Sequence, residues 1–391
     1  MATVETAVGG VSFALLDEQR ELRALAREFA EKEIRPRAPA CDVHMTHPAD
    51  VIAKAHEVGL MNLHVPEAYG GLGLNAFDGM LVGEELNWGC SGMGTAIAAN
   101  GLGAGPVLLA GTDAQKAQWL PPLLEKPILC SFGLSEPDAG SDVARMKTTA
   151  VRRGDEYVLN GSKTFITNAG YAAWTVVFAK TDPSIGHRGI SAFVVPMDSP
   201  GVTIEQHLDK MGQRATDTSA FALQDVVVPA ANRLGEEGQG FKIAMQTLDF
   251  TRPGTAAGAV GVAQAAYELS VEYAKERVAF DVPIAMHQGV NFMIADMATE
   301  IEAARLLTWQ AAWMLDDGRR ATLHSSFAKR FAADTAMKVT TDAVQVFGGY
   351  GYMREYPVEK LMRDAKLFQI YEGTSQIQRL VIAKEIFLPR G

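Results

Sequence analysis

Residues 289–318 read GVNFMIADMATEIEAARLLTWQAAWMLDDG and decide how the last part of this chain folds. Large apolar side chains recur there every few residues, with polar residues between them. They are Phe292, Ile294, Met297, Ile301, Leu306, Trp309 and Trp313. This spacing predicts one amphipathic helix of about 30 residues. A helix of that length buries its apolar stripe against other long helices, so the stretch predicts a helical bundle.

Helical periodicity continues on both sides of this stretch. Residues 256–280 and 327–349 carry the same pattern, and a final helix is expected after Glu372. The beginning of the chain also has helical spacing, with glycine-rich joints such as YGGLGL and GLGAGP between its segments. We therefore predict a helical domain over residues 1–129 and a helical bundle domain over residues 236–391.

Between these parts, residues 130–235 have the character of β-strands. Short segments such as WTVVFAKT, GISAFVVPM and FALQDVVVP are rich in β-branched residues and are bounded by Gly, Pro or Asp. Residues 155–168, DEYVLNGSKTFITN, are predicted to form a hairpin with Asn160 and Gly161 at its turn, because Asn-Gly favours tight hairpin turns. The chain is thus predicted to be an α+β protein with a helical, a β and a second helical domain.

The composition limits the classes of function. The chain is 48% hydrophobic and 21% charged, which is typical of soluble globular proteins, and its formal net charge is −10. This charge argues against nucleic acid or an anionic membrane as the main partner. No stretch has the ~18 uninterrupted apolar residues of a membrane span, and the N-terminus lacks the features of a secretory signal. We therefore expect a cytoplasmic protein without a membrane span.

Cysteine and histidine spacing gives no sign of a metal site. The three cysteines, Cys41, Cys90 and Cys130, lie far apart, and the eight histidines include no H-E-x-x-H pair. We expect reduced thiols and no bound metal.

An isolated carboxylate stands in the stretch LFQIYEGTSQIQR, residues 367–379. Glu372 follows apolar residues and directly precedes Gly373. It is either a residue at a helix start, with Thr374 or Ser375 as the N-cap, or a functional acid. Taken alone, the residues favour the helix-start interpretation.

Other stretches are also ambiguous when taken singly. Residues 131–148, SFGLSEPDAGSDVARMKT, would expose backbone N–H groups and hydroxyls to a phosphate or ring edge, or would simply connect two domains. In LDFTRP, Asp249 and Arg252 have the spacing of a helical ion pair. TFITNAG resembles a strand end, and QVFGGYGY resembles a helix end with bare backbone. No G-x-G-x-x-G is completed, so a nucleotide cofactor would bind without a Rossmann unit.

In their order along the chain, these motifs closely resemble the acyl-CoA dehydrogenase family, especially its medium-chain branch. The resemblance covers nearly the whole chain. It is carried by LMNLHVPEAYGGLGL, LSEPDAGSDV, FITNAG, KMGQRATDT, DFTRPGTAAGAVGVAQ, DAVQVFGGYGY and YPVEKLMRDAKLFQIYEGTSQIQR. It implies an N-terminal α-helical domain, a middle β-barrel or sandwich domain and a C-terminal four-helix bundle.

The resemblance also implies a reaction. Such enzymes hold FAD and oxidise an acyl-CoA thioester to the trans-2-enoyl-CoA. Glu372 would remove the α-proton while the β-hydride leaves to flavin N5. Electrons would then pass to electron-transfer flavoprotein, anchored near Leu60, Leu72 and Leu74. The expected assembly is a homotetramer, a dimer of dimers. An acyl-CoA oxidase and a non-catalytic CoA- or flavin-binding scaffold are the alternatives.

Individual contacts follow from the matching motifs. FAD is expected to contact Phe132, Leu134, Ser135, Gly140, Ser141, Phe165, Thr167, Arg277, Phe280, Gln288, Thr374 and Gln376, with Gln345 and Gly349 coming from a neighbouring subunit. The substrate is expected to contact Ser141, Asp249, Arg252, Tyr371, Gly373 and Lys384, and its acyl group to reach Gly94 and Ala98. Gly373 is expected to leave room for the thioester.

Two features depart from the family pattern. Asp281 stands where a glycine is usual in the FAD-binding R-x-x-F-G stretch, and Ala279 replaces a polar residue. The added carboxylate would repel a pyrophosphate unless it is solvated or turned away. Gly94, Ala98 and Ala99 are small where the medium-chain branch has bulkier side chains, which predicts a deeper or wider acyl pocket unless neighbouring side chains refill the space.

Overall fold

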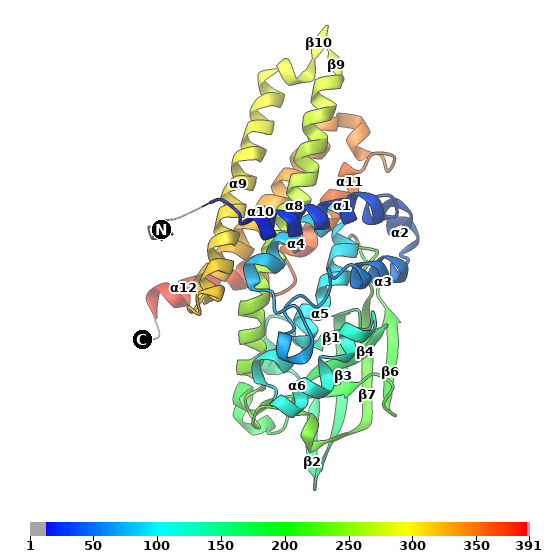
Figure 1. The fold of residues 1–391 in the computed structure, drawn as a ribbon, viewed down its shortest axis with the longest axis vertical. Helices are drawn as coiled ribbons and strands as arrows, with labels where there is room; N and C mark the ends of the chain where they lie inside the picture. The colour runs from blue at the N-terminus through cyan, green and yellow to red at the C-terminus, as the bar shows by residue number, and fades with distance from the viewer. Residues whose placement is uncertain (1–12, 389–391) are drawn as a thin grey trace, which may run out of the picture.

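The computed structural model describes residues 13–388, which form a helical bundle at one end and a β-sheet at the other (Figure 1). The first part contains α1 (Asp17–Phe29), α2 (Ala38–His44), α3 (Ala49–Glu57), α4 (Ala76–Gly89), α5 (Ser91–Ala110), α6 (Asp113–Trp119) and α7 (Pro122–Glu125). The sheet contains β1 (Leu129–Gly133), β2 (Thr149–Arg153), β3 (Glu156–Thr167), β4 (Ala172–Lys180), β5 (Ile190–Pro196), β6 (Val202–His207), β7 (Thr218–Pro229) and β8 (Arg233–Leu234). The last part contains α8 (Gly240–Glu276), β9 (Val278–Ala279), β10 (Val282–Pro283), α9 (Gln288–Asp316), α10 (Thr322–Phe347), α11 (Val358–Phe368) and α12 (Ser375–Phe387). This order confirms the predicted α+β fold.

The middle of the chain forms one mixed sheet with the strand order β6-β7-β3-β2-β4-β5-β8. Strand β1 pairs in parallel with β4, whereas the β2–β3, β3–β7 and β4–β5 pairs are antiparallel. Val176, Phe178 and Val194 of the sheet share a core with Val107 of α5 and Ile243 of α8. Helices from the first and the last part of the chain therefore pack on this sheet.

The hairpin turn predicted at Asn160 and Gly161 is wrong. Strand β3 runs straight through both residues, and the hairpin turn lies earlier, at Gly154 with φ 63°. The pairing of β3 with β7 shifts register between Leu159 and Gly161, so the Asn-Gly pair marks a β-bulge. A Cβ at Gly161 would overlap Thr148, which explains the glycine by close backbone approach rather than by a turn.

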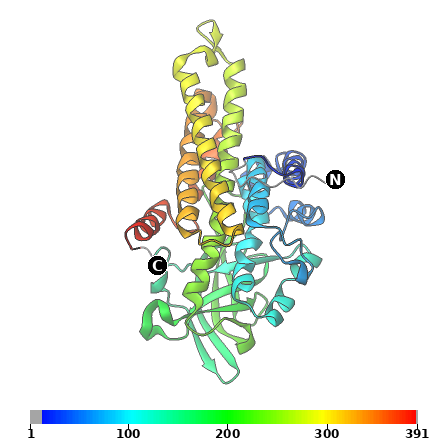
Figure 2. The ribbon, with the colours of Figure 1, turned by 60° about the vertical axis from the view of Figure 1, so that its left-hand side comes forward.

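The predicted long helix is present as α9, with 29 residues, and α8 is longer still, with 37. Helix α8 runs from the sheet to the far tip of the bundle (Figure 2). It contains Pro253, which has no N–H to offer the carbonyl of Asp249. The hydroxyl of Ser325 on α10 donates to that carbonyl at 3.0 Å. The helix therefore continues through the proline without an unpaired acceptor.

Helix α4 is tied to the bundle at its start and again in its second half. The Asp316 carboxylate, at the end of α9, accepts from the N–H groups of Ala76 and Phe77 at 2.7 and 2.9 Å. These are free donors of the first turn of α4, so a residue 240 positions away acts as its cap. Further along α4, buried Glu84 pairs with Arg305 of α9 at 3.0 Å. The first and last parts of the chain are joined by these contacts.

Among residues 13–388, one helix is long and apolar enough to cross a membrane by length and composition. It is α5, which packs against α4, α8 and β1 and has 61% of its apolar window buried inside the protein. A buried helix in the core of a protein can have the same length and apolar composition as a membrane-spanning helix. The packing of α5 accounts for its composition.

The three leucines expected near an electron-transfer partner differ in exposure. Leu60 is 2% exposed and belongs to the core, and Leu74 packs against the same cluster. Leu72 is 56% exposed. Of the three, Leu72 is the exposed residue, whereas Leu60 and Leu74 pack with the core.

A buried ion pair fixes the loop between β1 and β2 to the sheet. Lys163 of β3 is fully buried and donates to Glu136 Oε1 at 2.8 Å and to the Leu134 carbonyl at 3.3 Å. Glu136 also accepts from the backbone N–H groups of Lys147 and Thr148. Burial lowers the pKa of the Lys163 ammonium to about 8, an effect that Glu136 opposes. The loop therefore depends on one buried carboxylate.

We expect Glu136→Ala to lower the free energy of unfolding by about 3–5 kcal/mol, because the charge of Lys163 then stays buried without a partner. Urea unfolding measures the change. The matched control is Asp138→Ala, which removes an exposed pair with Lys147 and should change the free energy by less than about 1 kcal/mol. Equal effects of the two substitutions would contradict the importance of the buried pair.

Candidate active site

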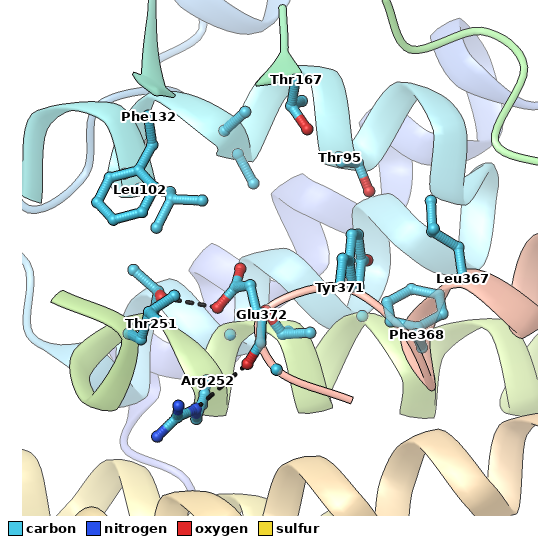
Figure 3. Close-up of a pocket in the computed structure, with 18 of the residues that line it drawn as sticks. Thr95, Leu102, Phe132, Thr167, Thr251, Arg252, Leu367, Phe368, Tyr371 and Glu372 are labelled. Atoms are coloured by element: carbon cyan, nitrogen blue, oxygen red, sulfur yellow. Dashed lines mark hydrogen bonds between the residues drawn. The ribbon is translucent and has the colours of Figure 1, made fainter. Parts of the chain in front are cut away.

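One cavity of about 1130 Å³ lies between the sheet, α4, α5, α8 and the segment that joins α11 to α12. It gathers most of the residues expected around the cofactor and the thioester (Figure 3). The predicted residues on its wall are Ala98, Phe132, Leu134, Ser135, Gly140, Ser141, Phe165, Thr167, Arg252, Tyr371, Glu372, Gly373, Thr374 and Lys384. These residues come from all three parts of the chain, and the fold brings them to one place.

Glu372 and Gly373 form a turn with left-handed backbone conformation. Their φ angles are 51° and 89°, between the end of α11 and the start of α12. A Cβ at Gly373 would lie 2.7 Å from Nε2 of Gln378 and 3.7 Å from Arg252. The glycine is therefore required by its backbone angle and by the buried side chain behind it. The expectation that it leaves room for the thioester is not supported by this geometry.

The side chain of Glu372 points into the cavity, where its Oε2 accepts a hydrogen bond from the Thr251 hydroxyl at 2.7 Å (Figure 3). Thr251 lies on α8, one residue before Arg252. Within the described part of the chain, no cationic side chain forms an ion pair with the Glu372 carboxylate. Because a carboxylate accepts several hydrogen bonds, one hydroxyl leaves this group able to accept a proton from a ligand.

The helix-start interpretation of this stretch is also partly correct. Thr374 is the N-cap of α12, and its hydroxyl accepts from the N–H of Ile377 at 3.1 Å. Gln376, also expected at the cofactor, is exposed on the first turn of α12 and does not line the cavity. The stretch therefore has two roles: the residues after Gly373 begin a helix, and Glu372 is displayed in front of it.

Behind the turn, three buried side chains donate to its carbonyl groups. Arg252 contacts the carbonyl of Glu372, Lys329 contacts the carbonyl of Gly373, and Gln378 contacts both. Lys329 and Gln378 were missed by the sequence analysis. Lys329 could have been identified by its position on the apolar face of a predicted helix, three and four residues before Ala332 and Ala333, which are buried.

Asp249 and Arg252, predicted to contact CoA, bind each other. Their side chains are 2.6 Å apart, and Asp249 also accepts from Thr322 at 2.7 Å. Arg252 is 3% exposed and reaches the cavity wall, whereas Asp249 does not. Burial raises the pKa of the Asp249 carboxyl and lowers that of the Arg252 guanidinium. Asp249 and Arg252 therefore form the helical ion pair that their spacing in the sequence also allowed.

The cavity presents a surface suited to a flavin ring. Phe165 has φ 60° and is 68% exposed at the cavity wall, an unusual position for a large aromatic residue. Ser135 and Ser141 from the loop after β1 lie on the same wall, with Thr167 at the end of β3. An apolar ring face beside hydroxyl groups is the combination that an isoalloxazine needs. The residues present therefore fit FAD.

The expectation of a deep pocket at Gly94 is wrong. Gly94 does not line the cavity, and a Cβ there would lie 2.9 Å from Nδ2 of Asn87. Asn87 of α4 is 5% exposed, lines the cavity and also packs against Gly258 of α8. Its amide occupies the space that the small residue would have opened. Ala98, by contrast, is exposed on the cavity wall, as predicted.

A second cavity, of about 430 Å³, lies in the bundle and contains Arg277 and Gly349 beside Tyr273 and Tyr350. Phe280, Gln288 and Gln345, the other residues expected around the far half of FAD, line neither of the two cavities. Phe280 and Asp281 lie at the exposed turn between β9 and β10, at the tip of the bundle (Figure 1). The carboxylate that departs from the family pattern is thus solvated.

The three parts of the chain match three family models in turn. The models are described as acyl-CoA dehydrogenase N-terminal, middle and C-terminal domains, and they match residues 16–127, 131–226 and 238–387. Together they account for most of the chain.

Individual proteins are similar over nearly the full length. The mitochondrial short-chain specific acyl-CoA dehydrogenase of Rattus norvegicus is 44% identical over 373 residues, 95% of this chain and 90% of that protein. The structure of butyryl-CoA dehydrogenase from Megasphaera elsdenii has a TM-score of 0.94 and 44% identity, over 96% of this chain and 100% of that chain. A structure described as the electron transferring flavoprotein of Acidaminococcus fermentans contains a chain with a TM-score of 0.95 and 45% identity, over 97% and 100% of the two chains.

We expect Gly373→Ala to destabilise the turn that carries Glu372, because the new Cβ meets Gln378 and the backbone stays left-handed. The free energy of unfolding should fall by about 1–3 kcal/mol, as measured by urea unfolding. Gly289→Ala is the matched control, since its Cβ meets nothing within 4 Å and its φ is not positive. A stability loss no larger than that of the control would mean that the turn tolerates a side chain.

Proposed function

Because the chain belongs to the acyl-CoA dehydrogenase family, we propose that Glu372 is the base that removes the α-proton of its acyl-CoA substrate. The enzyme is an FAD-dependent oxidoreductase acting on acyl-CoA thioesters. The observation that carries the proposal is the position of the Glu372 carboxylate. It stands in the main cavity between apolar side chains, opposite the wall that fits a flavin, without a cation paired to it.

The side chains around Glu372 suit this role. The Thr251 hydroxyl donates to Oε2 and fixes the orientation of the carboxylate, so that Oε1 is left to take the proton. The N–H of Glu372 forms no hydrogen bond within residues 13–388, and we propose that it donates to the thioester carbonyl. Such a donor stabilises the negative charge that develops on the carbonyl as the α-proton leaves. FAD, when bound, supplies the acceptor for the β-hydride.

The arrangement of the two cavities supports an assembled enzyme. The ring of FAD fits the wall that contains Phe165, whereas the residues expected at its far half lie in the bundle, around Arg277 and Gly349. We propose that the far half of FAD is completed by a neighbouring subunit, in a homotetramer. Such an assembly would also cover the exposed apolar residues of α12, among them Leu380 and Phe387.

We further propose that the electrons pass to electron-transfer flavoprotein. The similarity to a chain from the structure described by that name supports this partner. On this chain, Leu72 is the exposed apolar residue of the three expected at the contact. Oxygen is the competing acceptor, and aerobic peroxide production on addition of acyl-CoA would favour an oxidase instead.

We propose a short acyl chain as the substrate. The similar proteins named for short-chain and butyryl substrates support this choice. On this chain, the Asn87 amide fills the space beside Gly94 and places a polar group in the cavity wall. Asn87 Nδ2 donates to the carbonyl of Gly83 at 2.8 Å, whereas its Oδ1 has no hydrogen-bond partner within the described residues. A long apolar chain passing that point would keep this oxygen buried without a partner, which costs free energy.

We expect Glu372→Gln to lower the rate of anaerobic flavin reduction by butyryl-CoA by about 10²–10⁴-fold, because the amide cannot accept the proton. Stopped-flow absorbance of the bound flavin measures the rate, and the spectrum before mixing shows that FAD is retained. Glu272→Gln, at an exposed position on α8, is the control and should keep the parental rate. Reduction of the Glu372→Gln variant at the parental rate would refute the base assignment.

We expect kcat/KM, measured over a series of straight-chain acyl-CoA thioesters, to peak at about four to six carbons if Asn87 limits the cavity. Asn87→Ala should move the optimum to longer chains, because one large side chain is removed from beside Gly94 and Gly258. Asn232→Ala is a control at a buried asparagine outside the cavity. An unchanged profile for Asn87→Ala would show that another residue sets the chain length.

A further inference from the structure

The turn that carries Glu372 is held from behind by three helices. Lys329 Nζ donates to the carbonyl of Gly373 at 2.7 Å, and Gln378 Nε2 donates to the same carbonyl at 3.0 Å and to that of Glu372 at 3.2 Å. Arg252 Nε reaches the carbonyl of Glu372 at 3.4 Å. All three donors are at most 3% exposed, and they belong to α10, α12 and α8.

This support has a conformational reason. Glu372 is a non-glycine residue with φ 51°, a conformation that persists only where the surrounding structure enforces it. In it, the carboxylate points into the cavity towards Thr251, and the backbone carbonyl points the other way towards Arg252 (Figure 3). Without the donors behind it, the turn could relax to a conformation that aims the carboxylate elsewhere.

Packing alone does not explain the lysine at position 329. Lys329 is fully buried, and within the described residues it forms no ion pair. Its neighbours along the buried face of α10 are Ala328, Ala332 and Ala333. An apolar side chain would satisfy such a face without the cost of burying an ammonium group. Packing therefore does not account for a charged side chain at position 329.

We propose that Lys329 is a positioning residue for the base: its ammonium group holds the Glu372–Gly373 turn in place. This inference rests on the proposed role of Glu372. The side chain of Lys329 does not itself line the cavity, and it acts through the turn.

The electrostatic surroundings of Lys329 agree with this role. The charged groups that act on it are Glu372 in the turn, Arg252 on α8 and Asp334 on its own helix. Asp334 is itself paired with Arg379 of α12 at 2.9 Å and accepts from Gln369 and Ser375, so its charge is largely engaged. Burial lowers the pKa of Lys329 to about 7, and the negative charge of Glu372 opposes this shift.

The test is Lys329→Met, measured as the rate of anaerobic flavin reduction by butyryl-CoA between pH 5 and 9. We expect the maximal rate to fall about 10- to 100-fold, the size of effect seen when a reacting group is slightly misplaced. The dissociation constant of the substrate should stay within about threefold, because the side chain of Lys329 does not line the cavity. A parental rate would overturn the proposal.

Two further variants test positioning against general instability. Gln378→Met removes two hydrogen bonds to the carbonyls of Glu372 and Gly373 without removing a charge, and it should also slow reduction. If Lys329→Met does not retain FAD, Gln378→Met tests the support of the turn in its place. A parental rate of flavin reduction by Gln378→Met would then overturn the positioning role. Lys338→Met, on the outer face of α10 where it pairs with Glu300, is the control and should match the parent.

The same assay distinguishes a failure of this inference from a failure of the proposed function. If Glu372→Gln is inactive while Lys329→Met and Gln378→Met behave like the parent, Glu372 remains the base and only the role of the lysine is excluded. If Glu372→Gln itself reduces the flavin normally, both proposals fail.

Discussion

The left-handed turn at Glu372 and Gly373 is the constraint on which the rest of the site depends. Here the carboxylate of Glu372 points into the cavity from a left-handed backbone conformation, which a non-glycine residue keeps only where its surroundings enforce it. Hydrogen bonds from α8, α10 and α12 supply that hold. The bundle is thus more than a scaffold for the cavity, because the interior of the bundle determines where the carboxylate points.

Helix α8 connects the parts of the molecule that have to act together. Near its start it packs on the sheet through Ile243, in its second quarter it presents Thr251 to the carboxylate, and at its far end it reaches the second cavity at Tyr273. The proline within it is tolerated because Ser325 of α10 takes over the freed carbonyl. A single helix therefore connects the sheet beside the cavity, the surroundings of Glu372 and the tip of the bundle.

Several features of the chain depend on contacts between residues that are not adjacent in sequence. Such contacts cannot be predicted from local patterns in a single sequence. The small residue Gly94 suggested an open pocket, yet the Asn87 amide fills the space beside it. Asn160 and Gly161 suggested a turn, yet they form a bulge because Gly161 lies against Thr148. Each misreading came from a local pattern that fits two structures, and the contact that decides between them comes from elsewhere in the chain.

The sequence by itself determined the order of helices and strands, the long helix α9 and the family, and most of the residues that it predicted at the site lie on the cavity wall, because hydrophobic periodicity and ordered motifs are local properties of the chain. Only the tertiary structure decided that Asp249 and Arg252 pair with each other, that Leu60 is core, and that Lys329 stands behind the turn that carries Glu372. These outcomes depend on which side chains meet across helices far apart in sequence, and close packing of the interior fixes such meetings only once the whole chain is folded.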